Sequence, residues 1–225
     1  QVDVFAKKCR LAIVNKDGIA KVSSKVLAGE VVTMSIDWEH IPAKHRQLIK
    51  AFLDEADMSA DAIKTVDFSP ACGADIVVSC EKAKDPKNGS IYLKPTQFVL
   101  GIGCRRDTAF ENIDRAIRQS LLKLQIDISD IDMIASIDVK KDEPGIKEFC
   151  ERNRIEFVTY TADELMAVQG EFSASQFVRE HVGVDNVCER AAVLACSKEC
   201  NKAGELIYKK HKYDSVTVAA ARYPD

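Results

Sequence analysis

The sequence predicts an α/β protein with two α/β units, of which the C-terminal one is a mixed sheet covered by helices and ending in a β-hairpin. Short apolar segments of strand length alternate along most of the chain with segments in which apolar residues recur at helical spacing. The last two strand-like segments, residues 206–209 and 215–221, instead follow each other around a short turn. The length of 225 residues suffices for two small domains, which we place at residues 1–95 and 96–225.

The first domain is expected to be a small α/β unit. Its expected strands are residues 10–14, 31–36, 63–68 and 75–79, and its expected helices are residues 20–28 and 43–56. Residues 15–18 have the composition of a turn, and Gly29 is placed to end the first helix. The polar residues 81–90 predict an exposed loop, and residues 92–95 are interpreted as the passage into the second domain.

The second domain shows the alternation more clearly. Its expected strands are residues 98–103, 133–137 and 155–160, followed by the two hairpin strands; one helix is expected to end near residue 152, and the last helix covers residues 186–196. Three helix starts have the capping-box signature, in which two side chains bind orphan backbone N–H groups: Thr108 with Glu111, Thr161 with Glu164, and Ser173 with Gln176. After Thr108, apolar residues recur at three- and four-residue spacing up to Leu124, which predicts one buried stripe.

The charge balance and the hydropathy argue against two classes of partner. The 32 Lys and Arg residues against 35 Asp and Glu residues give a net charge of −3, whereas nucleic-acid-binding proteins usually carry a strong basic excess. No apolar run approaches the ~20 residues that a membrane-spanning helix needs, and no signal peptide opens the chain. We therefore expect a cytoplasmic protein that binds neither nucleic acid nor membranes. The chain begins with Gln1 rather than Met, which we interpret as the sign of a fragment.

The eight cysteines are scattered and include no Cys-x-x-Cys pair, so we expect reduced and mostly buried thiols. Cys196 and Cys200 lie one helical turn apart, with Cys188 two turns earlier. The local sequence supplies no fourth ligand for a metal there. We therefore predict no metal site.

The segment Gly101-Ile-Gly103-Cys-Arg105-Arg106 is a candidate anion-binding turn between a strand and a helix. Glycines allow a ligand to approach the backbone closely, and the following helix start offers free N–H groups and the positive end of the helix dipole. Arg105 and Arg106 add two cations, so a carboxylate or phosphate would fit. The segment is not a dinucleotide fingerprint, because Arg106 occupies the third glycine position. An ordinary strand–helix turn is the alternative.

A second candidate site follows the next strand. Asp138 is expected at the carboxyl end of that strand, where open α/β sheets bind ligands, and Lys140 and Lys141 could keep its carboxylate ionised. The alternatives are solvated lysines and a helix N-cap at Asp142 or Glu143.

A third candidate site lies at the start of the last helix. Asp185 or Asn186 can cap this helix, and Glu189 in its first turn is favourable to the helix dipole. Arg190 is placed either to pair with Glu189 or to contact a ligand. Cys188 would need a neighbouring base to act as a nucleophile, and no histidine is adjacent.

Four ordered segments of the second domain resemble one family. They are Gly101-Ile-Gly-Cys-Arg-Arg, Ala135-Ser-Ile-Asp-Val-Lys140 with Asp142-Glu143-Pro-Gly, Phe172-Ser-Ala-Ser-Gln-Phe-Val-Arg, and Val182-Gly-Val-Asp-Asn-Val-Cys-Glu-Arg-Ala191. They are similar to the C-terminal domain of the cobalamin biosynthesis protein G family, the cobalt-precorrin-5A hydrolases, and the likeness extends over about residues 97–223. Residues 1–94 resemble the middle region of this family more loosely. The family usually carries a further N-terminal domain, which nothing in this chain matches.

The resemblance implies a reaction of anaerobic cobalamin biosynthesis. The δ-lactone on ring A of cobalt-precorrin-5A is hydrolysed and a two-carbon unit leaves as acetaldehyde, which gives cobalt-precorrin-5B. The hydrolysis requires a base that activates water and a group that stabilises the oxyanion, and the C–C cleavage requires a second proton abstraction. Because the cobalt arrives with the substrate, we expect no cofactor of the protein's own.

The implied substrate carries many carboxylates, and seven residues are expected to bind it: Gly101, Gly103, Arg105, Arg106, Lys140, Asp185 and Arg190. We predict Asp138 as the general base, with Glu143 and Glu189 as alternatives. The expected partner is the anionic cobalt-corrinoid intermediate, and other enzymes of the cobalamin pathway are further candidates. The alternative interpretation is a non-catalytic module that binds or carries the corrinoid while an N-terminal domain holds the catalytic groups. A third interpretation is an α/β domain that binds another small anion.

Overall fold

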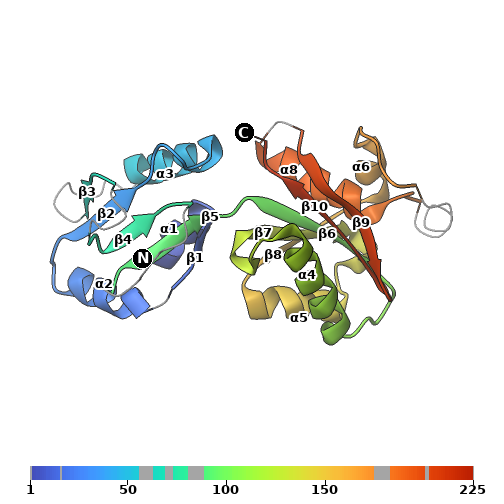
Figure 1. Ribbon diagram of the computed structural model, residues 1–225, viewed down its shortest axis with the longest axis horizontal. Coiled ribbons are helices and arrows are strands. Elements are labelled where there is room, and N and C mark those ends of the chain that lie inside the picture. The colour runs from blue at the N-terminus through green and yellow to red at the C-terminus, as the bar shows by residue number, and fades with distance from the viewer. Residues whose placement is uncertain are drawn as a thin grey trace. The chain divides into compact units, whose positions relative to one another are not determined.

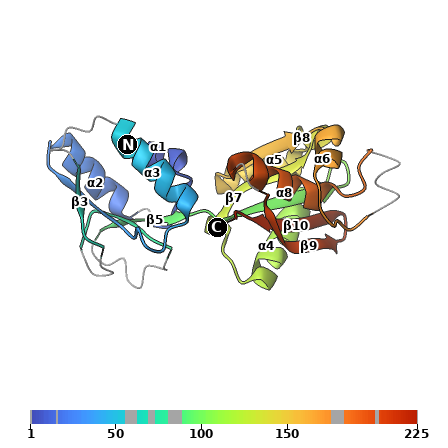
Figure 2. The same cartoon turned by 90° about the horizontal axis from the view of Figure 1, so that it is seen from above.

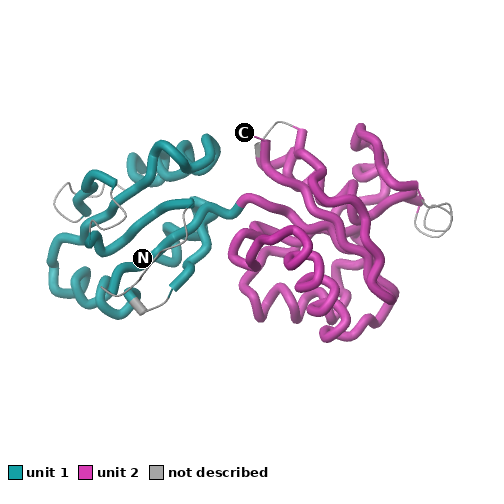
Figure 3. The backbone as a smooth tube through the Cα atoms, viewed as in Figure 1, with its two compact units in different colours: residues 1–96, 225 teal, residues 97–224 magenta. Residues whose placement is uncertain are grey.

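The computed structural model describes residues 2–15, 17–55, 63–68, 73–80, 89–174, 183–200 and 203–224. The chain divides into two compact units, residues 1–96 (unit 1) and residues 97–224 (unit 2), which Figure 3 shows in different colours. Each unit contains a five-stranded mixed sheet with helices (Figure 1). The α/β class that the sequence predicts is thereby confirmed, as is the β-hairpin at the end of the chain.

The described part of unit 1 consists of three helices and five strands: α1 (Val2–Lys8), β1 (Leu11–Ile13), α2 (Asp17–Leu27), β2 (Val32–Ile36), α3 (Ala43–Glu55), β3 (Ile63–Val66), β4 (Ile76–Val78) and β5 (Ile91–Pro95). The strand order is β1-β5-β4-β2-β3. Strands β5, β4, β2 and β3 are parallel to one another, and β1 pairs antiparallel with β5. From β2 the chain continues to β3 on one side and then to β4 on the other side, so the direction of winding changes between β2 and β4.

Three features of unit 1 differ from the sequence prediction. Helix α1 was not predicted, and α2 begins at Asp17, within the expected turn. The expected passage at residues 92–95 belongs to strand β5, in which buried Ile91 and Leu93 alternate with half-buried residues. This alternation is that of a strand with one buried face. Most of the loop expected at residues 81–90 lies outside the described residues.

Unit 2 consists of the following described elements: β6 (Phe98–Cys104), α4 (Phe110–Leu124), η1 (Ile128–Asp130), β7 (Ile131–Ile137), η2 (Asp138–Lys140), α5 (Pro144–Asn153), β8 (Glu156–Tyr160), α6 (Ala162–Ala167), α8 (Val187–Cys200), β9 (Glu205–Tyr213) and β10 (Val216–Arg222). The strand order is β8-β7-β6-β10-β9. Strands β6, β7 and β8 are parallel, and the terminal hairpin of β9 and β10 adds antiparallel to β6. The carboxyl ends of β6, β7 and β8 therefore lie at one edge of the sheet.

Helices cover both faces of this sheet. Helices α4 and α5 pack on one face, where Leu100 and Ile102 of β6 are buried, and α6 and α8 pack on the other, where Val99 is buried (Figure 1). In the view from above, α8 lies over the strands (Figure 2). A Cβ atom on Gly101 would lie 1.7 Å from the carbonyl oxygen of Cys188 in α8. Only a glycine permits this approach of helix to strand.

The predicted capping boxes have different outcomes. The box of Thr161 and Glu164 is confirmed, with the Glu164 N–H donating to Thr161 Oγ1 at 3.2 Å. The box at Thr108 is wrong: α4 begins after Ala109 with no side-chain cap, and the Thr108 hydroxyl donates to the carbonyl of Arg105 instead. Gln176 of the third predicted box lies outside the described residues.

The packing at Gly101 leads to a stability prediction. Gly101→Ala should lower the free energy of unfolding by about 1–3 kcal/mol, because the new methyl group would meet backbone of α8 that has little room to shift. Gly103→Ala is the matched control, since its Cβ would meet only the rotatable Thr217 hydroxyl, at 2.7 Å. Urea unfolding followed by circular dichroism measures both. Equal losses in the two variants would contradict the packing argument.

Candidate functional site

The candidate site is the edge of unit 2 at which the parallel strands end. Arg105 follows β6, Asp138 begins the short helix η2 after β7, and Thr161 follows β8. Ligands of open α/β sheets bind beyond the carboxyl ends of the strands. Two of the three segments that the sequence singles out therefore meet at this edge.

Glu143 joins the loop after β6 to the loop after β7. Its side chain is buried, its Oε1 accepts the Thr108 N–H at 2.9 Å, and its Oε2 accepts Lys140 Nζ at 2.8 Å. Lys140 thus pairs with Glu143 and not with Asp138, contrary to expectation. Glu143 is the N-cap residue of α5, but its side chain makes no capping hydrogen bond. Through these contacts Glu143 and Lys140 stabilise the loops after β6 and β7. The geometry therefore does not favour Glu143 as the base or Lys140 as a contact to the ligand.

Three charged side chains that the sequence predicts for the site, Asp138, Arg105 and Arg106, lie at this edge and remain available. Asp138 is half-buried, and both arginines are exposed. Within the described part of the chain, none of the three side chains makes a hydrogen bond or an ion pair. A carboxylate and two guanidinium groups in this state can contact a ligand without first breaking an internal pair.

Gly101 and Gly103 have different surroundings. Gly101 is buried beneath α8, and the close packing of β6 against α8 explains why a glycine stands at this position. Gly103 is half-buried beside Thr217 of β10. Its contact with substrate stays a prediction.

Glu189 has a structural role. Its side chain is 0% exposed, and the carboxylate accepts hydrogen bonds from the N–H and hydroxyl of Ser173, both at 2.8 Å, and from the N–H of Lys210 at 2.6 Å. The pairing of β9 with β10 shifts register opposite Ala219, beside Lys210. The register shift is a β-bulge, which leaves the Lys210 N–H without a partner in the adjacent strand, and the Glu189 carboxylate accepts this N–H instead. This burial does not support Glu189 as a catalytic base.

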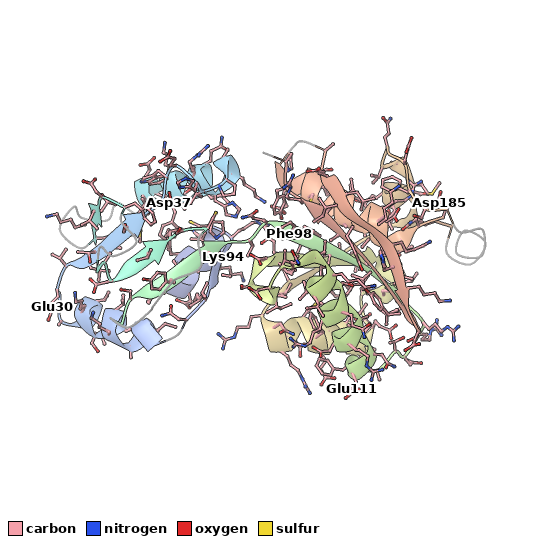
Figure 4. All side chains as sticks on the ribbon, in the orientation of Figure 1. Glu30, Asp37, Lys94, Phe98, Glu111 and Asp185 are labelled. Carbon is pink, nitrogen blue, oxygen red and sulfur yellow. The ribbon has the colours of Figure 1, made fainter. Side chains whose placement is uncertain are left out.

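Arg190 pairs with Asp185 and not with Glu189. Its Nε and Nη2 donate to the two carboxylate oxygens of Asp185, at 2.7 and 3.2 Å. Its Nη1 donates to the carbonyls of Leu165 and Val168, and its guanidinium lies 4.5 Å from the centre of the Phe172 ring. The pair holds the segment after α6 against α8, near the label of Asp185 in Figure 4. The helix cap comes from Asn186, whose Oδ1 accepts the Glu189 N–H.

Six cysteines have a described environment: Cys9, Cys150, Cys188 and Cys196 are buried, and Cys80 and Cys104 are half-buried. Burial raises the pKa of Cys104 to about 11, although Lys140 opposes the shift, and burial raises the pKa of Cys188 to about 12. Both thiols are therefore protonated at neutral pH and are poor nucleophiles. Among the residues that the structure describes, no three His, Cys, Asp or Glu side chains are grouped as a metal site would require. No helix of this same part is long and apolar enough to cross a membrane.

Sequence reasoning missed a polar cluster in unit 1, formed by Asp37, His40 and Ser79. The available signal was that Asp37 follows one expected parallel strand directly and that Ser79 ends another. Because the order of the strands in the sheet was unknown, the sequence did not show that these two strands are neighbours.

The family follows from a comparison with known proteins. The family model described as "Cobalamin synthesis G C-terminus" matches residues 98–221, which is more than half of the chain. The chain belongs to this family. The resemblance found in the sequence is thereby confirmed.

Two relatives and one solved structure agree with this assignment. A "Probable cobalt-precorrin-5A hydrolase" of Methanocaldococcus jannaschii is 33% identical over 137 residues, which cover 59% of this chain and 42% of that protein. A "Cobalt-precorrin-5A hydrolase" of Priestia megaterium is 26% identical over 232 aligned positions, with 99% of this chain and 58% of that protein covered. The crystal structure of CobE, a protein from the cobalamin biosynthetic pathway, matches with a TM-score of 0.54 at 26% identity and covers 57% of this chain and 91% of CobE. The chain thus spans about half the length of these curated relatives.

The Asp185–Arg190 pair predicts an acid-sensitive contribution to stability. The hydrogen bond from Arg190 holds the pKa of Asp185 below its ordinary value, against the opposing effect of burial. The pair's contribution is therefore fully present above the unfolded pKa of about 3.9 and is lost as the pH falls through the lower folded pKa. Asp185→Asn should cost about 1–3 kcal/mol at pH 7, and this difference from the wild type should shrink in acid.

Urea unfolding of both proteins at neutral and acidic pH measures this difference. Asp163→Asn, at an exposed aspartate in the first turn of α6, serves as the control and should change little. A difference for Asp185→Asn that stays constant with pH would contradict the ionic character of the pair.

Proposed function

We propose that this chain acts in cobalamin biosynthesis on cobalt-precorrin-5A, hydrolysing its δ-lactone and releasing acetaldehyde. Membership of the cobalamin synthesis G family and the names of the relatives support the pathway and the substrate. The observation that carries the proposal in the structure is the combination of Asp138, Arg105 and Arg106 at one sheet edge, without partners among the described residues. We propose that the substrate's cobalt is the metal present and that the protein needs no cofactor of its own.

The residues of this edge fit the roles that the reaction requires. Arg105 and Arg106 would bind carboxylates of the corrinoid, because guanidinium groups form strong, charge-assisted hydrogen bonds with them. Asp138 would act as a general base, since its carboxylate accepts no hydrogen bond and forms no ion pair among the described residues and directly follows β7, the strand that pairs with β6. The Lys140–Glu143 pair would position Asp138 by fixing the short helix η2 on which it lies.

A second candidate function is supported by one specific observation. CobE matches this chain over 91% of its own length, so a protein of that extent occurs in the pathway as a separate chain. This favours the alternative that unit 2 binds or carries a corrinoid intermediate while other parts of the protein perform the chemistry.

The first test is acetaldehyde release from cobalt-precorrin-5A under anaerobic conditions, by this chain and by a version extended at its N-terminus. We expect Asp138→Asn to lower the rate about 100-fold or more, as is typical for loss of a general base, with little change in corrinoid binding. Asp142→Asn is the matched control, because this neighbouring carboxylate is 76% exposed and, among the described residues, forms an ion pair with Lys147 alone. Release by the extended protein alone would favour the carrier interpretation, and full activity of Asp138→Asn would contradict its role as base.

The arginines predict a separate effect on binding. Arg105→Gln and Arg106→Gln should each weaken corrinoid binding about tenfold, equivalent to about 1.4 kcal/mol, and should make it less sensitive to salt. Absorption titration of the corrinoid measures the affinity. Arg118→Gln is the control, because Arg118 is already paired with Asp114 on α4. Unchanged affinity in both variants would place the anion-binding surface elsewhere.

A further inference from the structure

Unit 1 carries a polar cluster at the position where sheets of this kind bind ligands. Strands β2 and β4 are parallel neighbours, with Ile36 opposite Val78, so Asp37 and Ser79 follow the two strands side by side. The chain winds from β2 to β3 on one side and reaches β4 on the other, which makes this pair of strands the topological switch point. At such a point the connections diverge, and a crevice is left beyond the carboxyl ends of the strands.

A buried carboxylate holds an imidazole at this switch point. Asp37 is 2% exposed, and its Oδ1 lies 2.9 Å from His40 Nδ1 and also accepts the His40 N–H at 3.3 Å. Its Oδ2 accepts the Ser79 hydroxyl at 3.2 Å, and its own N–H donates to the carbonyl of Val78. Asp37, labelled in Figure 4, is therefore fixed from both strands. The side chain of His40, in contrast, is 63% exposed.

This geometry suits proton transfer. When Nδ1 carries the hydrogen and donates it to Asp37, the basic lone pair of the imidazole is on Nε2. A carboxylate that binds Nδ1 also fixes the ring and stabilises the imidazolium that forms when Nε2 takes a proton. Histidine is the side chain whose ordinary ionisation lies closest to neutral pH, so it can accept and return a proton under those conditions.

We propose that His40 is a proton-transfer residue for ester hydrolysis and that Asp37 is its positioning residue. Nε2 takes a proton from water as the water oxygen attacks the ester carbonyl. The bond from the carbonyl carbon to the ring oxygen then breaks, and the proton passes to that oxygen, which gives a hydroxyl and a carboxylic acid. The inference rests on the proposed function in one respect, namely that the ester hydrolysed is the δ-lactone of the corrinoid. His40 would serve the opening of the lactone.

A model ester tests the site without the corrinoid. His40→Gln should lower the hydrolysis of 4-nitrophenyl acetate by this chain about 100-fold, and Asp37→Asn should lower it as well. His211→Gln is the matched control for general imidazole reactivity, because His211 is exposed and stacks on Tyr208 in β9. Hydrolysis by His40→Gln at the wild-type rate would overturn the proposal.

A spectroscopic measurement keeps the role of Asp37 separate from folding. The ¹⁵N shifts of the His40 ring should show the neutral tautomer with its hydrogen on Nδ1, and a hydrogen on Nε2 would overturn the assignment. Asp37→Asn retains one oxygen that can accept from the His40 donors, its NH2 group can donate to the Ser79 hydroxyl oxygen, and the charge is lost. We therefore expect it to fold with an unchanged circular dichroism spectrum and to alter the ring shifts.

The corrinoid assay then connects the site with the pathway. With cobalt-precorrin-5A, His40→Gln should leave the lactone closed, so mass spectrometry would find the substrate at its original mass. Loss of ester hydrolysis in His40→Gln with normal lactone opening would overturn the link to this substrate. If the wild-type chain hydrolyses the ester through His40 but leaves the corrinoid unchanged, the proposed function fails while the ester-hydrolysing site stands.

Discussion

The close approach of α8 to β6 at Gly101 is the constraint on which unit 2 depends. Because strand and helix backbone touch there, the first turn of α8 is buried and brings Glu189 and Arg190 into the interior. Buried charges are costly unless they are paired or hydrogen-bonded. Three donors around Glu189 and the Asp185 carboxylate beside Arg190 meet this requirement, and in doing so they hold β9 and the segment after α6 in place.

The charges of unit 2 consequently divide into two groups. Glu189, Arg190 and the Lys140–Glu143 pair are committed to internal contacts, and a ligand could recruit them only at the cost of breaking those contacts. Asp138 and the two arginines after β6 carry no such cost, because they keep access to solvent and their side chains make no hydrogen bond or ion pair with another described residue. At this edge the Lys140–Glu143 pair stabilises the loops, whereas Asp138, Arg105 and Arg106 are available to bind a ligand.

The sequence predicts most of the regular structure because periodicity is a local property. It fails where tertiary contacts decide: β5 depends on its neighbours in the sheet, and Thr108 contributes its N–H to Glu143 instead of capping α4 with its hydroxyl. For the candidate site, the sequence places Arg105 and Asp138 after two strands, as the structure does, but it does not give the partners of the charged side chains. Lys140 and Arg190 each have more than one acidic residue nearby in the sequence. The tertiary arrangement of the loops decides which of these acids each one binds, and spacing along the chain does not predict it. The neighbouring positions of Asp37 and Ser79 likewise follow from strand order.

Unit 1 contains an internal comparison that clarifies what is unusual about Asp37. Asp75 is equally buried, but it precedes β4 at the opposite end of the sheet and binds Lys25 at 2.9 Å as well as the N–H and hydroxyl of Thr33. These donors lower the pKa of Asp75 in spite of its burial, which makes it a fixed anion. Its ion pair with Lys25 therefore joins α2 to the sheet and contributes to the stability of the fold. Asp37 has an imidazole as its partner instead, and a buried anion that holds a titratable, solvent-facing ring at a switch point is arranged for proton transfer rather than for stability alone.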